Sequence, residues 1–294
     1  MSTTTHAPRK TPEERQAQAE ALHASITEQV EALRDTAQWL RFLDFAQHLH
    51  SYSLNNLFLI LSQCPDASRV AGFRAWQAVG RQVRKGETGI RIFGYSKKTI
   101  TEEDSAGNEV EKSFARFPIL SVFDISQTDL IDGEADGSTI TEQLTGSDDF
   151  GIIEALTAHL TGAGWTIERR ELPGSKNGYT EPQARLVVLD ANLSSEHAAK
   201  TLIHEAAHIE LGHIDDIREY VEHRGIAETE AESVAYIVAG MVGFDTSAYS
   251  IGYIAGWADG DTELIKSTAA RVLRASHTIA GILTPDAGED AGEG

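Results

Sequence analysis

The chain is poor in cysteine and has no long apolar run. Its 294 residues include a single cysteine, Cys64, which excludes an intramolecular disulfide framework and a cysteine-based zinc site. No stretch approaches the roughly 18 uninterrupted apolar residues of a membrane span. The N-terminal segment MSTTTHAPRKTPEERQAQAE also lacks the apolar core of a secretion signal. We therefore expect a cytoplasmic protein without a membrane partner.

Basic residues are scarce as well. The chain has 25 Lys and Arg residues against 45 Asp and Glu residues, which gives a formal net charge of −20. Such an acidic surface disfavours nonspecific binding of nucleic acid by the protein as a whole. Hydrophobic residues make up 41% of the chain, which is enough for the cores of two domains of ordinary size.

The most informative motif is HEAAH at 204–208. On a helix, His204 and His208 lie one turn apart on the same face, so both rings can reach one cation. Glu205 lies beside that cation, where a general base for a bound water is needed. Residues 197–211 contain four alanines and neither Gly nor Pro, which predicts the required helix. The motif therefore predicts a hydrolytic site with one Zn²⁺ ion.

A second helix, predicted over 227–240, offers the third ligand. Glu228 and Glu232 lie on one of its faces, next to alanines that allow close packing against the HEAAH helix. We expect Glu228 to bind the metal and Glu232 to hydrogen-bond a ligand histidine from behind. Glu232 and His213 are the alternative third ligands, and Glu230 is expected to be solvated. The fourth zinc position is left for water, as in a gluzincin-like peptidase.

Patterning along the chain predicts an α+β fold in two modules. We expect a disordered N-terminus over 1–20, an α+β module over 21–128, an acidic linker over 129–149, a helix-rich module with a small β-sheet over 150–284, and a disordered acidic tail over 285–294. The linker assignment rests on seven acidic residues without any Lys or Arg.

Apolar spacing also predicts individual elements. In the first module we expect helices between 20 and 61, a short helix over 73–80, and a strand over 90–95 that pairs with 114–123 across a polar loop. In the second module we expect a helix over 150–160, strands over 166–172 and 185–189, and further helices near 250–258 and 262–283.

A basic, aromatic stretch contrasts with the acidic chain. From Arg69 to Lys98 there are eight basic residues and one acidic residue, Glu87. Cations that contact phosphates, beside rings that stack on bases, are the ingredients of single-stranded DNA binding. The candidate contacts are Asn55, Arg74, Trp76, Arg81, Arg84 and Lys85. In the alternative interpretation, Trp76 and Phe73 belong to the core and the charges only solubilise a hairpin.

Three segments of the first module resemble the N-terminal domain of ArdC-type antirestriction proteins. They are SLNNLFLI at 53–60, GFRAW at 72–76 and GRQVRKGETGI at 80–90, and VFDISQT at 122–128 is similar to that domain's closing strand. The resemblance implies that this module binds single-stranded DNA. It also implies a factor borne by a plasmid or mobile element, which protects incoming DNA from host restriction.

The second module resembles the zincin-like metallopeptidase domains joined to such N-terminal domains, which are related to the ImmA/IrrE peptidases. His204, Glu205 and His208 match the family's HExxH, and 228–235 matches its Glu-x-x-Ala-Glu/Asn pattern. The resemblance implies that this module binds zinc.

Together these observations predict an antirestriction-type zinc metallopeptidase that binds single-stranded DNA. Glu205 is its expected catalytic base for peptide hydrolysis, and the protein substrate is unknown. One alternative is a noncatalytic DNA-masking protein with a structural zinc. The other is a regulatory metalloprotease that cleaves a repressor, with the basic module only recruiting the target.

Overall fold

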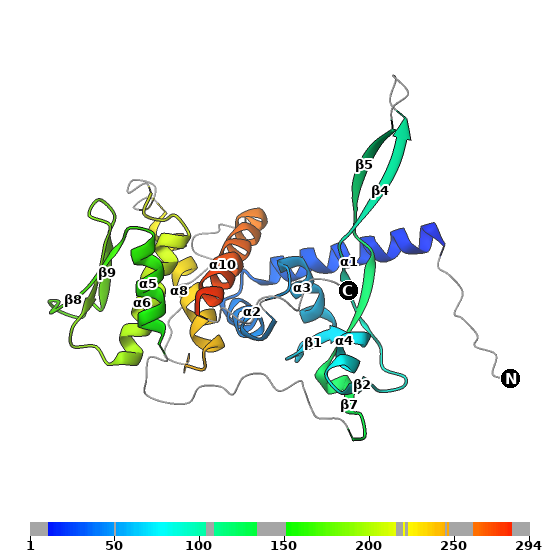
Figure 1. The fold of residues 1–294 in the computed structure, drawn as a ribbon, viewed down its shortest axis with the longest axis horizontal. Helices are drawn as coiled ribbons and strands as arrows, with labels where there is room; N and C mark the ends of the chain where they lie inside the picture. Colours follow the sequence, from blue (N-terminus) through cyan, green and yellow to red (C-terminus); the bar gives the residue numbers. More distant parts are fainter. Residues whose placement is uncertain are drawn as a thin grey trace.

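The computed structural model describes residues 11–49, 51–103, 109–133, 151–215, 220, 223–244, 246 and 261–283. Over these residues the chain has the predicted α+β fold, with helices along the middle of the molecule and small sheets on either side (Figure 1). Among the residues that the structure describes, no helix is long and apolar enough to span a bilayer.

Three helices begin the described chain: α1 (Pro12–Ala32), α2 (Thr36–Leu49) and α3 (Leu54–Gln63). The predicted disorder over 1–20 is wrong for 12–20, and 1–10 lie outside the described residues. A capping box starts α1, because Thr11 and Glu14 each accept a hydrogen bond from the other's backbone N–H. The first turns are exposed, so they offered no apolar stripe in the sequence.

The described part of the first module contains three small antiparallel sheets, one of which is a hairpin. One has the order β1-β6-β3, from β1 (Val70–Gly72), β6 (Ile119–Asp124) and β3 (Ile90–Phe93), and the predicted pairing of β3 with the end of 114–123 is observed. Another pairs β2 (Arg81–Val83) with β7 (Thr128–Leu130). The short helix α4 (Phe73–Ala78) precedes β2, and the 3₁₀ turn η1 (Ile125–Gln127) precedes β7. Strand β7 therefore includes Asp129 and Leu130, which the sequence placed in the linker.

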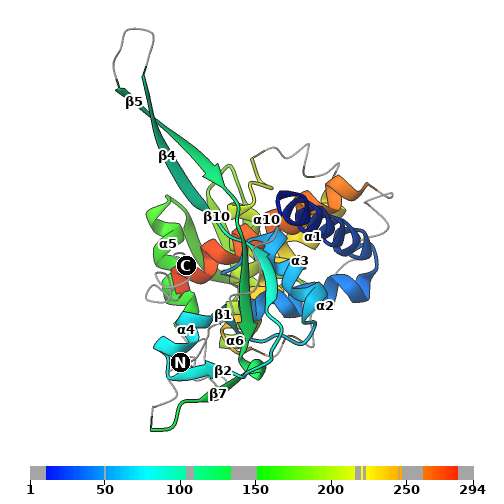
Figure 2. The same ribbon diagram turned by 90° about the vertical axis from the view of Figure 1, so that its right-hand side faces the viewer.

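The polar loop predicted before 114 is instead a β-hairpin. Its strands are β4 (Ser96–Glu103) and β5 (Glu109–Arg116), paired antiparallel from Ser96↔Arg116 outward. The ribbon stands away from the body of the molecule (Figures 1 and 2). Since it covers no core, its strands do not need the apolar alternation by which strands are found in a sequence.

The second module begins with α5 (Ile152–Gly162) and a sheet of order β8-β10-β9. Strands β8 (Thr166–Arg170) and β10 (Leu186–Asp190) are parallel and agree with the predicted strands. Strand β9 (Gly178–Glu181) pairs antiparallel with β10 and was not predicted, because it is short and begins with glycine.

Three long helices complete the fold: α6 (Ser195–Glu210), α8 (Arg224–Met241) and α10 (Thr262–Leu283). All three were predicted, whereas the helix expected near 250–258 lies outside the described residues. Ser194 caps α6 by accepting a hydrogen bond from the backbone N–H of His197. Gly212 follows the end of α6 with φ of 70°, the left-handed conformation that glycine adopts readily.

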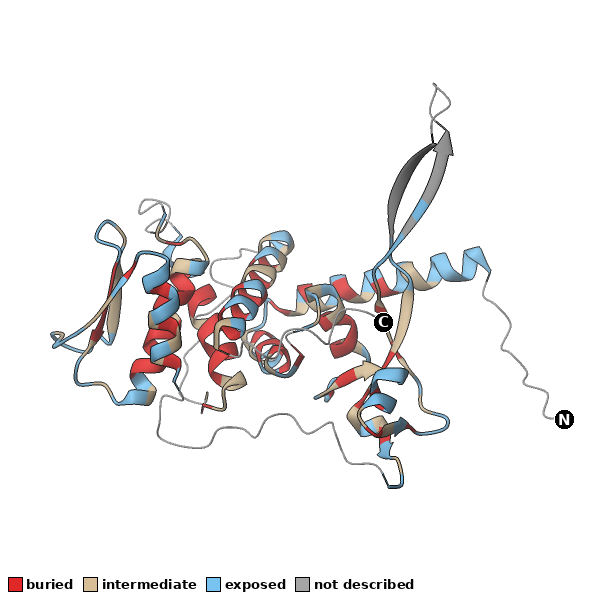
Figure 3. Cartoon of the chain, in the orientation of Figure 1, coloured by how far each residue is buried: buried red, intermediate tan, exposed pale blue. Residues whose placement is uncertain are grey.

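The two modules share one hydrophobic core. Helix α2 packs on α8, where the buried Trp39 Nε1 donates to Ser233 Oγ at 3.0 Å and Tyr236 donates to Asp44 at 2.6 Å. Buried residues continue from the N-terminal helices through α8 and α10 to α6 and β10 (Figure 3). Helix α8 is thus held by both halves of the chain.

Candidate metal centre

Helices α6 and α8 bring His204, His208 and Glu228 to one point. The two histidine Nε2 atoms are 3.1 Å apart, and they lie 3.6 Å (His204) and 3.8 Å (His208) from Glu228 Oε2. Two ligands on a tetrahedral zinc with bonds of about 2.0–2.1 Å are about 3.3 Å from each other. The three separations lie around that value, so the cluster fits a small divalent metal without rearrangement.

The Glu228 carboxylate is held from both sides. The nearby His204 and His208 rings lower its pKa well below the ordinary value. Its other oxygen, Oε1, accepts a hydrogen bond from the Tyr220 hydroxyl at 2.5 Å. Burial, with the nearby carboxylate, raises the pKa of Tyr220 to about 12, so the phenol keeps its proton. Tyr220 was not a candidate in the sequence, because no local pattern links it to Glu228, eight residues further along the chain.

His204 lies between two carboxylates. Burial alone would lower its pKa, but Glu228 and Glu232 outweigh that effect and raise it to about 10. Glu232 Oε2 lies 3.1 Å from His204 Nδ1, behind the imidazole, where the sequence placed it. The predicted hydrogen bond is not formed, because this buried nitrogen has no partner with hydrogen-bond geometry among the described residues. Glu232 therefore lies beside His204 Nδ1, and Glu228 is the carboxylate that faces the two Nε2 atoms.

Glu205 is nearly buried and faces a cavity. Its Oε2 accepts a hydrogen bond of 2.7 Å from Thr180 Oγ1 on β9. The cavity has a volume of about 570 Å³, and its wall includes His204, Glu205 and Glu232 as well as Gly178 at the start of β9. A carboxylate so placed is next to the candidate metal ligands and within reach of a molecule in the cavity.

The prediction that Glu230 is solvated is wrong. Glu230 is 2% exposed, and its carboxylate contacts His213 Nε2 at 2.8 Å and Arg271 Nε at 3.1 Å. His213 is also buried, and burial lowers its pKa. Its Nδ1 lies 3.0 Å from His208 Nδ1, on the side of that ring away from Glu228. His213 is therefore not among the atoms that converge on the metal position. The covering residue, Arg271, comes from α10, so local sequence could not reveal the burial.

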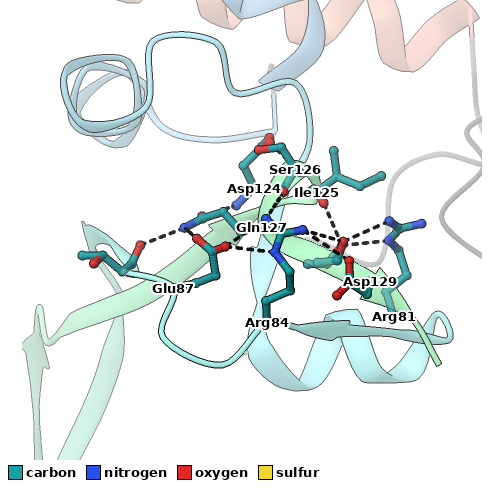
Figure 4. A network of polar contacts seen from close by, with 10 residues as sticks. Arg81, Arg84, Glu87, Asp124, Ile125, Ser126, Gln127 and Asp129 are labelled. Carbon is teal, nitrogen blue, oxygen red and sulfur yellow. Dashed lines mark hydrogen bonds and ion pairs between the residues drawn. The ribbon is translucent and has the colours of Figure 1, made fainter.

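Two of the residues predicted to contact DNA instead make contacts within the protein. Trp76 is 1% exposed and its Nε1 donates to the Phe123 carbonyl at 2.9 Å, so it is a core residue, as the alternative interpretation held. The same interpretation is wrong for Phe73, which is 43% exposed. Arg84 forms ion pairs with Glu87 at 2.8 Å and Asp129 at 3.3 Å (Figure 4). The basic stretch is thus partly neutralised by Asp129, which lies outside it in the sequence.

The other predicted contacts are distributed over the module. Arg81 Nε donates to Thr128 Oγ1 at 2.8 Å, across the β2–β7 pair (Figure 4). Asn55 on α3, Arg74 on α4 and Lys85 after β2 are exposed. The structure therefore leaves these three side chains accessible to a ligand, and it ties Arg81 and Arg84 to neighbouring strands.

An exposed aromatic pair lies at the base of the β4–β5 hairpin. Tyr95 is 62% exposed and Phe117 is 65% exposed, and their ring centroids are 5.9 Å apart. Phe117 was not a candidate in the sequence, because it lies outside the basic stretch from Arg69 to Lys98. Lys97, two residues after Tyr95, and Arg116, directly before Phe117, are also exposed.

The fold and the cluster define an α+β protein with a candidate metal centre of the HExxH type. Residues 16–123 match the N-terminal domain of anti-restriction factor ArdC. These residues are thus similar to the ArdC N-terminal domain, and the resemblance seen in the sequence is confirmed for this part of the chain.

Other known proteins are similar over more of the chain. The uncharacterized protein pXO2-81 of Bacillus anthracis is 26% identical over 279 residues, which cover 83% of this chain and 47% of that protein. The chain therefore spans about half the length of the curated relative it matches. Crystal structures of the antirestriction ArdC protein from plasmid R388, metal-free and Mn(II)-bound, are each 20% identical and cover 80% of this chain and 86% of theirs, with TM-scores of 0.45 and 0.43.

Proposed function

We propose that the protein is an antirestriction factor that binds single-stranded DNA and has a zinc-dependent peptidase site. The observation that carries the peptidase part is the convergence of two Nε2 atoms and one carboxylate oxygen, at 3.1–3.8 Å from each other, beside Glu205. This is the donor set of a catalytic zinc site with one position left open. The family of the N-terminal domain supports the antirestriction part.

In this proposal His204, His208 and Glu228 hold the ion, which supplies Lewis-acid chemistry when bound. The Glu205 carboxylate takes a proton from the attacking water and returns it to the leaving amine nitrogen. Thr180 keeps that carboxylate in place through its hydrogen bond, and Tyr220 does the same for Glu228. The adjoining cavity of about 570 Å³ is of a size that holds a small ligand or a short peptide segment.

Zinc titration of wild-type protein and three variants tests the site. We expect wild type to bind one ion and both His204→Ala and Glu228→Ala to bind it more than about 100-fold less tightly. Replacing a residue that only hydrogen-bonds a ligand already lowers metal affinity about 10–100-fold, so replacing a ligand should lower it further. Glu205→Gln is the matched control, because it should bind zinc like wild type and lose peptide hydrolysis. Wild-type affinity in Glu228→Ala would exclude Glu228 as a ligand, and undiminished hydrolysis by Glu205→Gln would exclude Glu205 as the base.

For DNA we propose the base of the β4–β5 hairpin as the contact surface. Tyr95 and Phe117 are exposed and adjacent, and Lys97 and Arg116 flank them. No acidic residue occurs from 94 to 100 or from 112 to 123, in a chain whose net charge is −20. Rings that stack on bases and cations that contact phosphates suit a single strand, and the projecting ribbon gives it access.

Anisotropy titrations of a labelled oligothymidylate test this surface. Stacking is worth about 1–3 kcal/mol per base, so Tyr95→Ala and Phe117→Ala should each weaken binding about 5- to 150-fold. Lys97→Gln should lower the slope of log K against log salt by about 0.7 if it removes one phosphate contact. Leu130→Ala is the control, since Leu130 is an exposed apolar residue elsewhere, at 50% exposure. Equal binding by wild type and both aromatic variants would exclude the hairpin base.

A further inference from the structure

A chain of polar contacts runs from His208 away from the candidate metal position. His208 Nδ1 lies 3.0 Å from His213 Nδ1, and His213 Nε2 lies 2.8 Å from Glu230 Oε2. Arg271 Nε donates to the same carboxylate oxygen at 3.2 Å, and the Arg271 guanidinium also donates to the Leu211 carbonyl at 2.9 Å. The chain joins α6, the turn after it, α8 and α10.

The position of each proton along this chain follows from the donors and acceptors. An ionised carboxylate only accepts hydrogen bonds, so the proton between His213 and Glu230 is on His213 Nε2. A neutral His213 then has its lone pair on Nδ1, and the proton between the two rings belongs to His208 Nδ1. The lone pair of His208 is left on Nε2, which is the atom that faces His204 and Glu228.

The opposite arrangement would block the metal. If His213 carried its proton on Nδ1, it would donate to His208 Nδ1, and a neutral His208 would then carry its own proton on Nε2. A protonated Nε2 has no lone pair for an ion. Arg271 opposes this arrangement, because its Nε donates to the same Glu230 oxygen that faces His213 Nε2, so that oxygen acts as an acceptor.

We propose that His213, Glu230 and Arg271 are positioning residues that hold His208 in the Nδ1–H tautomer and so keep Nε2 ready for the metal. The inference rests on the proposed metal site. Glu232 takes the corresponding place behind His204, at 3.1 Å from its Nδ1. Helix α8 thus directs Glu230 toward one histidine ligand, through His213, and Glu232 toward the other. Residues two apart on a helix point to different sides, which lets one helix reach both rings.

Nitrogen NMR of ¹⁵N-histidine-labelled, metal-free protein tests the tautomer directly. The spectra show which nitrogen of each imidazole ring carries the proton. We expect wild-type His208 as the Nδ1–H tautomer and wild-type His213 as the Nε2–H tautomer. The Nε2–H tautomer for wild-type His208 would overturn the proposal, and this result needs no variant to fold.

The zinc affinity of a matched pair of His213 variants tests whether the tautomer of His208 affects metal binding. In His213→Asn the amide oxygen takes the place of the ring Nδ1 and still accepts from His208, whereas His213→Leu has the same branched shape without an acceptor. We expect affinity about 10–100-fold below wild type for the leucine variant, with mixed His208 tautomers, and near wild type for the asparagine variant. A purely structural role for His213 would not change the tautomer of His208.

Two outcomes separate this inference from the proposed metal site. If wild type binds zinc and His213→Leu is folded and binds it equally well, the positioning role is wrong and the metal site stands. If wild type binds no zinc while its His208 is the Nδ1–H tautomer, the metal site is wrong and the proton arrangement stands.

Discussion

Asp124 is expected to be a main stabilising residue of the N-terminal domain. It is 1% exposed, and its carboxylate accepts hydrogen bonds from the backbone N–H groups of Ser68 (2.9 Å), Arg69 (3.1 Å) and Ser126 (2.8 Å). Leaving a buried donor unpaired costs about 1–3 kcal/mol. Asp124→Ala leaves three donors unpaired, so we expect a loss of roughly 3–5 kcal/mol in the free energy of unfolding. Asp124→Asn keeps one accepting oxygen, so its loss should be about 1.5–3 kcal/mol.

The pH dependence gives an independent test of the same residue. Burial raises the pKa of Asp124, but the hydrogen bonds from Ser126, Arg69 and Ser68 outweigh it, and the folded pKa lies below the ordinary value. A lowered folded pKa means that the stabilisation is present above the unfolded pKa of about 3.9 and is lost as pH falls through the folded value. The difference between wild type and Asp124→Asn should therefore be constant near neutrality and shrink below about pH 4.

Urea unfolding of the full chain, followed by tryptophan fluorescence, measures both effects. Trp76 is a suitable probe, because its Nε1 donates to the carbonyl of Phe123, the residue before Asp124. Ser126→Ala is a useful comparison, since it keeps the backbone donor and removes the hydroxyl, whose hydrogen bond also lowers the pKa of Asp124. A difference under about 0.5 kcal/mol between wild type and Asp124→Asn at neutral pH, or one that persists unchanged in acid, would refute the reasoning.

Further predictions concern the core and the metal centre. Trp76→Ala should lower the free energy of unfolding by about 3–5 kcal/mol in urea melts, because it empties a buried site, whereas a DNA-contact residue would leave stability unchanged. Zinc at about 100 times its Kd should stabilise wild type by about 2.7 kcal/mol, seen as a rise in Tm that His204→Ala lacks. Thr180→Val removes the hydroxyl that holds Glu205, so kcat for peptide hydrolysis should fall about tenfold, or ~1.4 kcal/mol, at unchanged zinc affinity.

Local patterns in the sequence were sufficient for the elements that carry the candidate ligands. The alanine-rich sequence around His204 and His208 predicted α6. Helix geometry alone showed that Glu228 and Glu232 share one face of α8. Those side chains meet as the periodicity predicted, because α6 and α8 pack against each other. The pairing of the two helices needed only one assumption, that alanines on both allow close contact.

Contacts between distant segments could not be predicted in the same way. Glu230 was expected to be solvated because its own helix offers it no partner, and the partner Arg271 is 41 residues away on α10. Arg84 was expected to be available because Asp129 lies 45 residues beyond it, on β7. In both cases a charge was judged by its neighbours in the chain, and tertiary packing supplied the opposite charge.

Helix α8 connects the candidate metal centre with the N-terminal half of the chain. Its first turns carry Glu228, Glu230 and Glu232, which face the candidate metal centre or the histidine behind it. Its middle carries Ser233 and Tyr236, which bond to Trp39 and Asp44 of α2, a helix of the N-terminal half. Because a helix moves largely as a rigid rod, a shift of α2 would displace the carboxylates as well as the core. The ArdC-type domain and the metal centre therefore cannot be treated as independent units, since the placement of the ligands depends on helices from both halves.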